Sequence, residues 1–531
     1  FYVAIEEERR QTHAEYRKLW EQSPSERAAD DRALIDLEPI AQTQVDDNRY
    51  ELRARVPDDA VSKLREGDVA LASDGSPVEG HAELCRITTL EDAVVVETDE
   101  PVELRRLDVY PSEISVDRML TALHDAVLKG DERRKDVVFG RREPSFRDRS
   151  ADGDRPTYVD NNAAQDAAVA LAVDAEDCAL IHGPPGTGKT YTIARTIRAL
   201  VENGNRVLLA AFTNRAVDNA IEALRDQGFD DVCRIGSESG VRHDMHDLRL
   251  VERGDPDAKA AELRSAPVVA ATTAACGSRV LRECSFDVAL VDEASQLTEP
   301  STHAAIALAD RFVLVGDHQQ LPPVVRAEND LERSLFERLI EAYPDASVLL
   351  DRQYRMSQRI QAFSSTAFYD GALRPATPSV ARRSLADLAD LDALPTGLDG
   401  GVTVVDPDGT RDGNRNVTEA RQVAAIVDAY RAAGVDPEDI GVIAPFRAQV
   451  AEIGGRTDVT VDTVDRFQGS AKEVIVVSFV ATGTLDGPIF EDHRRVNVAL
   501  TRAKRQLTLV CDTDALASDP FYARMLEWAR R

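Results

Sequence analysis

This sequence lacks paired cysteines. None of its six cysteines belongs to a CxxC pair, and they are spread along the chain at Cys85, Cys178, Cys233, Cys276, Cys284 and Cys511. We therefore expect incidental or buried thiols in a reducing cytoplasm, and no zinc or iron–sulfur site within this chain. It also lacks a signal-peptide pattern and any apolar run of the ~18 residues that span a bilayer, so no membrane partner is expected. The chain starts at Phe1 rather than Met, which favours a piece of a longer protein.

Positive charge is also in short supply. The 64 basic residues are nearly all arginine, and 94 Asp and Glu residues outnumber them, which gives a net charge of -30. Such a charge should repel a polyanion, so either nucleic acid is not the partner or the acidic coat has another purpose. Abundant Asp, Glu, Ala and Val resemble the composition of proteins from salt-loving archaea. In their concentrated potassium the Debye length falls to about 3 Å or less, so an acidic coat does not exclude a nucleic-acid ligand.

The first 157 residues divide into three predicted parts. Residues 1–49 begin with charged sequence of helical spacing, which predicts an exposed helical stalk. Residues 50–115 predict a small β-barrel. Residues 116–157 predict a returning helix and then a polar linker at 141–155. The predicted barrel strands are Tyr50–Val56, Asp68–Ala72, Ala82–Ile87 and Ala93–Glu97.

Strand-like apolar runs then alternate with helical stretches in two successive regions, residues 158–346 and 347–531. This alternation is typical of α/β domains with a parallel sheet. In the first region the predicted strands are Cys178–His182, Val207–Ala211, Val268–Ala271, Val288–Val291 and Phe312–Val315. In the second they are Gly401–Val405, Ile440–Ala444, Val474–Phe479 and Leu507–Val510.

A glycine-rich loop of the pattern GxxxxGK[ST] follows the first of these strands. Its glycines let backbone N–H groups wrap phosphates, and the next helix adds its positive end. Lys189 is predicted to neutralise the β and γ phosphates, and Thr190 to hold Mg²⁺. The predicted ATP-binding residues here are Gly183, Pro184, Pro185, Gly186, Thr187, Gly188, Lys189 and Thr190.

A second acidic signal supports nucleotide hydrolysis. The apolar run Phe286–Val291 ends in Asp292 and Glu293. Asp292 can bind magnesium through water, and Glu293 can orient and deprotonate the attacking water. An ordinary acidic strand end is the alternative interpretation.

These residues lie inside longer motifs that resemble those of superfamily 1 helicases. Residues 292–296 read DEASQ, and residues 313–323 read VLVGDHQQLPP, which is similar to motif III of that family. The resemblance implies two tandem RecA-like P-loop domains, with Gln320 as the γ-phosphate sensor. Residues 162–165 read NAAQ and resemble the Q-motif, which implies that Gln165 reads the adenine edge.

The second region carries matching motifs. Residues 349–356, LLDRQYRM, resemble motif IV, which implies that Tyr354 stacks on adenine and Arg355 reaches the γ-phosphate. Residues 495–504, RVNVALTRAK, resemble motif VI, with Arg502 as a second arginine finger. An arginine finger from the opposite domain makes hydrolysis depend on domain closure and accelerates it about 10³-fold or more.

Motif V shows one departure from the family. Residues 461–469, VDTVDRFQG, resemble it and imply that Gln468 and Gly469 join the ATP site. The family usually has Glu two positions after this glycine, where it meets the sugar, whereas this chain has Ala471, and Glu473 lies two residues further on. Discrimination at the ribose is therefore an open question.

Several positions resemble contacts to a nucleic-acid backbone. Hydroxyls and amides at loop ends suit phosphate contacts, although each threonine is also a plausible helix cap. Aromatic residues make up 5% of the chain, so stacking platforms for bases should be few. The predicted nucleic-acid contacts are Thr213, Asn214, Val217, Thr272, Thr273 and Thr463.

The wording of the motifs is typical of the 5′-to-3′ branch of superfamily 1. That branch includes the nonsense-mediated-decay RNA helicase, the immunoglobulin-switch-binding helicase and the DNA-replication nuclease-helicase, and the last is the most similar. The resemblance implies an ATP- and Mg²⁺-dependent helicase on single-stranded DNA, with an iron–sulfur nuclease module upstream of Phe1. We expect a monomer, since the predicted ATP site is complete within one chain. An RNA helicase, an ATP-regulated nucleic-acid clamp and a P-loop ATPase of another type are the alternatives.

Overall fold

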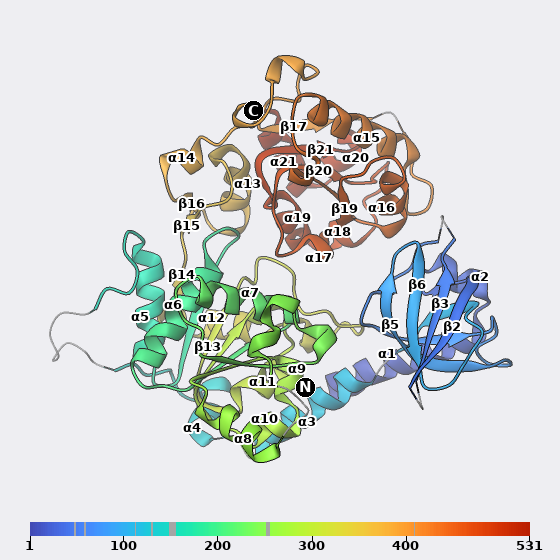
Figure 1. The fold of residues 1–531 in the computed structure, drawn as a ribbon. Helices are drawn as coiled ribbons and strands as arrows, with labels where there is room; N and C mark the ends of the chain where they lie inside the picture. Colours follow the sequence, from blue (N-terminus) through green and yellow to red (C-terminus); the bar gives the residue numbers. More distant parts are fainter. Residues whose placement is uncertain are drawn as a thin grey trace. The chain divides into compact units, whose positions relative to one another are not determined.

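The computed structural model describes residues 1–46, 49–57, 60–111, 113–128, 131–147, 156–250, 255–407 and 409–531 (Figure 1). These form two compact units, Phe1–Asp117 with Val325–Asn329, and Arg118–Val324 with Asp330–Arg531. The predicted linker lies partly outside the description, because residues 148–155 are not among the described residues.

The first unit opens with the predicted helix, but that helix is not fully exposed. Helix α1 (Tyr2–Glu21) buries Ile5 and Leu19, and α2 (Pro24–Ala29) follows it. The Glu8 carboxylate of α1 accepts the backbone N–H groups of Arg326 and Ala327 at 2.7 and 3.0 Å. The stalk therefore has a buried face because a distant segment, Val325–Asn329, returns to pack on it.

A seven-stranded antiparallel sheet makes up the rest of this unit. Its order is β1-β7-β4-β5-β6-β3-β2, and its core contains Leu52, Ile87 and Val96. The strands begin before residue 50, so the predicted boundary between stalk and barrel is wrong. All nine residues of β2 are exposed. Because neither face of this strand is buried, its sequence does not need to alternate between apolar and polar residues. Closure of the sheet into a barrel stays a prediction. The strands are β1 (Ala33–Leu34), β2 (Glu38–Asp46), β3 (Arg49–Arg55), β4 (Val69–Ser73), β5 (Ala82–Leu90), β6 (Ala93–Thr98) and β7 (Arg106–Val109).

The second unit contains two α/β lobes. We define lobe 1 as residues 156–350 without Val325–Asn329, which belong to the first unit, and lobe 2 as residues 351–531. Helices α3 (Ile114–Leu128) and α4 (Glu132–Val138) precede them. Val137 and Val138 of α4 pack into the core of lobe 1, although α4 precedes that lobe in the sequence.

Lobe 1 has a parallel sheet of order β10-β11-β9-β12-β13-β8-β14. All five predicted strands are confirmed. Strand β14 pairs with β8, so the predicted boundary at residue 346 cuts this sheet and is wrong. The strands are β8 (Cys178–His182), β9 (Val207–Ala211), β10 (Val232–Ile235), β11 (Val268–Thr272), β12 (Phe286–Asp292), β13 (Ala309–Gly316) and β14 (Ser347–Leu349). The helices are α5 (Ala163–Asp174), α6 (Lys189–Glu202), α7 (Asn214–Arg225), α8 (Pro256–Ser265), α9 (Thr273–Cys276), α10 (Arg279–Arg282), α11 (Glu299–Ile306) and α12 (Leu335–Ala342).

Lobe 2 has a parallel sheet of order β17-β21-β20-β18-β19. The four predicted strands are confirmed, and the short polar β19 was not predicted. The strands are β17 (Val402–Val405), β18 (Ile440–Ala444), β19 (Thr460–Thr463), β20 (Lys472–Ser478) and β21 (Ala503–Val510), and β15 (Arg352–Gln353) pairs with β16 (Arg374–Pro375) beside them. The helices are α13 (Gln358–Phe368), α14 (Pro378–Ala381), α15 (Val417–Ala432), α16 (Arg447–Gly454), α17 (Val464–Phe467), α18 (Pro488–Glu491), α19 (His493–Leu500), α20 (Thr513–Ala517) and α21 (Pro520–Arg530).

Both sheets are buried on both faces. Two apolar clusters flank the sheet of lobe 1 and two flank that of lobe 2, which explains the nearly continuous apolar strands. Parallel strands align their carboxyl ends at one edge, and loops at such edges form the usual ligand sites.

All six cysteines are free thiols, and among the described residues we find no helix long and apolar enough to cross a membrane.

Candidate active site

The glycine-rich loop connects β8 to α6, as predicted. Lys189 folds back over it, and its Nζ donates to the carbonyl oxygen of Gly183 at 2.6 Å. Thr187 braces the loop by donating from its hydroxyl to the Pro184 carbonyl at 2.7 Å. The ammonium group is therefore already over the loop, where phosphate oxygens could replace Gly183 as its acceptor.

Gly186 brings the two lobes together at this loop. Its φ of +76° is left-handed, and a Cβ here would lie 2.6 Å from the Cβ of Arg355. Its carbonyl oxygen accepts the backbone N–H of Tyr354 at 2.8 Å. The start of lobe 2 thus lies directly against the phosphate loop of lobe 1, and only glycine permits that approach.

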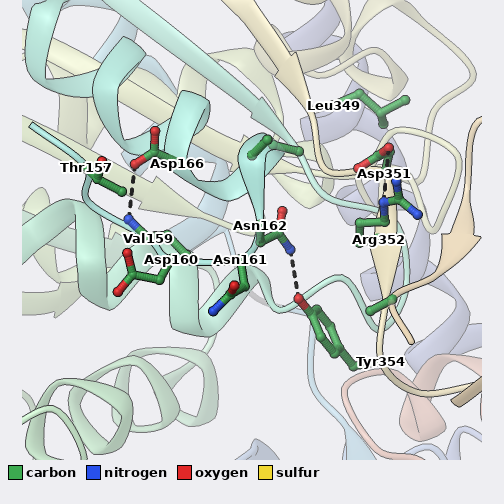
Figure 2. Close-up of a pocket in the computed structure, with 13 residues that line it drawn as sticks. Thr157, Val159, Asp160, Asn161, Asn162, Asp166, Leu349, Asp351, Arg352 and Tyr354 are labelled. Carbon is green, nitrogen blue, oxygen red and sulfur yellow. Dashed lines mark hydrogen bonds and ion pairs between the residues drawn. The ribbon is translucent and has the colours of Figure 1, made fainter. Parts of the chain in front are cut away.

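A cavity of about 910 Å³ lies beside the loop, between the start of lobe 1 and residues 349–354 and 376 (Figure 2). Asn162 donates from Nδ2 to the Tyr354 hydroxyl at 2.8 Å across it, and Asn162 Oδ1 accepts the backbone N–H of Gln165. Gln165 is buried and donates from Nε2 to the Thr187 carbonyl at 3.0 Å. Gln165 therefore supports the phosphate loop, while Tyr354, which is 40% exposed, lines the cavity. The roles of both residues toward adenine stay predictions.

The two acidic residues after β12 have different environments. Asp292 is buried, and burial, together with the charge of Glu293, raises its pKa to about 7. Glu293 has a left-handed backbone, with φ 51° and ψ 36°, and its carboxylate accepts Gln296 Nε2 at 2.9 Å. Strained backbone of this kind is common at functional sites. The Gln296 hydrogen bond holds one oxygen of the Glu293 carboxylate.

The donor set fits a magnesium ion. Asp292 offers a carboxylate, and Thr190, in the first turn of α6, offers a hydroxyl. Hard oxygen donors beside phosphates are what Mg²⁺ prefers. A cation held there would favour the ionised form of Asp292 and so reverse its raised pKa.

Two arginines of lobe 2 lie close together in this site. Arg502 is 2% exposed and donates to Gln320 Oε1 at 3.2 Å and to the Val498 carbonyl at 3.0 Å. Burial first, and then the charge of Arg355, lowers the pKa of Arg502 to about 9. Burial lowers the pKa of Arg355 to about 10, and its guanidinium donates to the Thr501 carbonyl at 3.1 Å. A buried cation and a partly buried one that repel each other create a place where a polyanion such as triphosphate would be strongly favoured.

Gln320 connects the arginines to a buried carboxylate that was not predicted. Its Nε2 donates to Asp317 at 2.6 Å, and His182 approaches the other oxygen of Asp317 at 3.0 Å. Burial alone would raise the pKa of Asp317, but the hydrogen bond and charge of His182, the charge of Lys189 and the hydrogen bond of Gln320 together lower it to about 2. From lobe 2, Tyr369 also donates to Asp317, at 2.8 Å. Asp317 is therefore ionised and shared by both lobes.

The predicted nucleic-acid residues lie at carboxyl ends of strands, and most also have local structural roles. Thr213 caps α7 by accepting Ala216 N–H, and Thr272 caps α9 by accepting Ala275 N–H. Asn214 accepts a hydrogen bond from Arg234 at 2.8 Å. Val217 is fully buried in the core of lobe 1, so its side chain cannot contact a nucleic-acid strand. Thr273, which is buried, and Thr463, which is half-buried, stay predictions.

Motif V lies near Arg502, because the carbonyl of the next residue, Ser470, accepts Arg502 Nη1 at 3.2 Å, while the roles of Gln468 and Gly469 toward ATP stay predictions. Gln468 is half-buried and Gly469 is exposed, with a φ of +83°. Glu473 accepts Lys504 and Arg505 at 2.7 Å each, so it is already paired within lobe 2. This pairing favours the prediction that Glu473 leaves the sugar-contacting position of Ala471 without an acid.

Four site residues escaped the sequence analysis: His182, Asp317, Tyr369 and Asn497. Asp317 and Asn497 lie inside motifs III and VI, so their motif positions were a usable signal. His182 was visible only as the last residue before the glycine-rich loop. Tyr369 had no signal, because its neighbours Asp317 and Asn497 are far from it in sequence.

The fold and site define a two-lobed P-loop ATPase whose site takes residues from both lobes. Two family models, each described as an AAA domain, match residues 160–258 and 246–328, and residues 331–514. An uncharacterized ATP-dependent helicase, MJ0104 of Methanocaldococcus jannaschii, is 30% identical over 88% of this chain and 86% of that protein. This chain belongs to that family of ATP-dependent helicases.

The predicted resemblance to replication nuclease-helicases is confirmed. The DNA replication ATP-dependent helicase/nuclease DNA2 of Mus musculus is 36% identical over 68% of this chain and 38% of its own length. The corresponding protein JHS1 of Arabidopsis thaliana is 35% identical over 69% of this chain and 29% of its own length. This chain thus spans about a third of either relative. Among solved structures, the arterivirus nonstructural protein 10 helicase has a TM-score of 0.44 and 13% identity, covering 91% of this chain and 80% of that one.

Proposed function

We propose that this ATP-dependent helicase moves along single-stranded DNA in the 5′-to-3′ direction and unwinds duplex DNA during replication or repair. DNA is the preferred track because the relatives of 35–36% identity are named DNA replication helicase/nucleases. The direction rests on the wording of the motifs. We further propose that the working unit is a cytoplasmic monomer, because one chain supplies every group of the ATP site.

The observation that carries the proposal is the hydrogen bond between Arg502 and Gln320. One residue comes from lobe 2 and the other from lobe 1, and they lie 3.2 Å apart beside the phosphate loop. Hydrolysis would therefore require the lobes to be together, and product release would let them part. The two lobes would close and open repeatedly while each holds the DNA strand. In this way ATP hydrolysis would be converted into movement of the protein along the DNA.

Each group has a proposed task. Lys189 neutralises the β and γ phosphates, Gln320 senses the γ-phosphate, and Glu293 deprotonates the attacking water. Arg355 and Arg502 neutralise the charge that spreads over the transferring phosphoryl group. Thr190 and Asp292 would hold Mg²⁺, which supplies charge neutralisation between the phosphates.

An upstream nuclease module is part of the proposal. The replication relatives are named helicase/nucleases, and this chain matches about a third of their length. The six cysteines of this chain are scattered and form no CxxC pair, so we propose that the upstream module itself supplies the ligands of its iron–sulfur cluster.

The test is ATP hydrolysis without nucleic acid, with single-stranded DNA and with RNA of matched sequence, in ~2 M KCl to match the acidic composition. Lys189→Ala is the inactive control. We expect DNA to stimulate hydrolysis well above RNA, and 5′-tailed duplexes to be unwound in preference to 3′-tailed ones. Equal or stronger stimulation by RNA would assign an RNA helicase. No stimulation by either polymer would refute the motor.

A further inference from the structure

We propose that Tyr369 is a positioning residue that reaches from lobe 2 into lobe 1 and, through Asp317, fixes the side-chain amide of Gln320 for ATP hydrolysis. This inference rests on the proposed function only in giving Gln320 the role of γ-phosphate sensor. It assigns a task to a tyrosine that lies outside every motif of the sequence.

The hydroxyl of Tyr369 is part of a buried connection between the lobes. It donates to Asp317 Oδ2 at 2.8 Å and accepts Asn497 Nδ2 at 2.9 Å. Asn497 also donates to the Gln319 carbonyl at 2.8 Å. Asp317 and Tyr369 are 1% and 4% exposed. Besides Arg502, lobe 2 therefore contacts the sensor loop of lobe 1 through Tyr369 and Asn497, and the Tyr369–Asp317 contact is buried.

Asp317 determines which way the Gln320 amide faces. An ionised carboxylate can only accept, and a guanidinium can only donate. Gln320 lies between the two, with Nε2 2.6 Å from Asp317 and Oε1 3.2 Å from Arg502. The reversed amide would set oxygen against oxygen and N–H against N–H. Only one orientation is therefore stable, and it leaves the second N–H of Nε2 for an acceptor such as a γ-phosphate oxygen.

Tyr369 in turn holds Asp317. The Oδ1 oxygen of Asp317 receives His182 and the backbone N–H of Gln319 at 3.0 and 3.1 Å, whereas Oδ2 receives Gln320 and Tyr369. Without the tyrosine hydroxyl, Oδ2 keeps only Gln320 as its donor and loses its link to lobe 2. Lobe 2 would then orient the sensor amide through Arg502 alone, and Asp317 would be held only by groups of lobe 1.

The experiment compares Tyr369→Phe with Tyr430→Phe. Tyr430 is also buried in lobe 2, and its hydroxyl forms a hydrogen bond with the Thr508 hydroxyl at 2.7 Å, away from the ATP site. Tyr430→Phe therefore measures how much kcat falls when any buried tyrosine hydroxyl of lobe 2 is lost. For ATP hydrolysis with saturating DNA, we expect Tyr369→Phe to lower kcat about ten-fold, as for one lost hydrogen bond to a charged group. KM for ATP should stay within about two-fold, and Tyr430→Phe should match the wild type.

A double-variant cycle tests the route through Gln320. In a Gln320→Ala background, Tyr369→Phe should lower kcat little further, because the amide that it positions is gone. The proposal would be overturned if Tyr369→Phe lowered kcat by the full amount in the Gln320→Ala background. It would also be overturned if Tyr369→Phe alone left kcat unchanged or raised only KM, or if Tyr430→Phe lowered kcat equally. If Tyr369→Phe fails to fold, Asp317→Asn, which permits both amide orientations, should show the same fall in kcat, and a wild-type kcat there would overturn the proposal.

Failure of the proposed function is a separate outcome. If DNA does not stimulate the wild type, the motor on DNA is refuted. The effect of Tyr369→Phe on the basal kcat then still decides the role of this residue.

Discussion

Replacing Arg502 by alanine should separate ATP binding from ATP hydrolysis. The guanidinium is held by the protein itself: it donates to the carbonyls of Val498 and Ser470 at 3.0 and 3.2 Å and to Gln320 Oε1 at 3.2 Å. A pre-positioned cation of this kind stabilises charge that develops at the γ-phosphate during transfer, so its loss should reduce kcat about 10³-fold, or about 4 kcal/mol of barrier. KM for ATP should change by less than about ten-fold, because Lys189 and the loop N–H groups hold the ground state.

The assay measures initial rates of phosphate release with saturating single-stranded DNA, and the affinity for a fluorescent ATP analogue. Arg502→Lys keeps the charge but not the forked donors, so it should recover only part of the lost rate. Arg279→Ala is the matched control, since that arginine has a side chain 90% exposed and pairs only loosely with Glu283. The reasoning is refuted if Arg502→Ala raises KM while kcat stays near the wild-type value, because the finger would then serve binding.

Three more predictions follow from the same geometry. Glu293→Gln should bind ATP normally but hydrolyse it about 10²–10⁴-fold more slowly, as for loss of a general base, and a wild-type rate in single-turnover experiments would contradict this role. Asn162→Ala removes both the cap of α5 and the contact with Tyr354, so KM for ATP should rise and stability should fall by about 1 kcal/mol, whereas Tyr354→Phe should raise KM alone; equal stability losses would contradict the assignment. The pKa of Asp317 is lowered to about 2 from its ordinary 3.8, so its ionised form should contribute ~2 kcal/mol of stability above about pH 4, lost as pH falls from about 4 to 2. Denaturant unfolding should therefore show a weaker acid dependence in Asp317→Asn than in the wild type, and identical slopes would exclude the contribution.

The elements that the sequence predicted well are those with a local cause. Strands Cys178–His182 and Ile440–Ala444 were predicted to the residue because each is a short apolar run buried on both faces. The glycine-rich loop was equally legible, since it must be a strand, a turn of glycines and a helix in that order. The motif residues Gln320 and Arg502 were identified for the same reason, and the structure places them in contact.

The errors arose where a residue's partner is distant in sequence. The stalk was predicted to be exposed because nothing near Glu8 shows that residues 326 and 327 return to it. Strand β14 was assigned to the wrong lobe because its partner β8 lies far upstream. The all-exposed β2 lacks the alternation by which strands are predicted.

The sequence by itself determined the ATP chemistry and the family of this protein, because phosphate binding, water activation and charge neutralisation each need particular side chains at fixed spacing on local elements. The tertiary structure alone decided how those groups are coupled. It brings Asp317, Tyr369 and Asn497 together from both lobes, and it engages Gln165 with Thr187 of the phosphate loop. The physical reason is that a hydrogen bond between lobes depends on how two separately folded sheets pack, and no local pattern of residues encodes that distance.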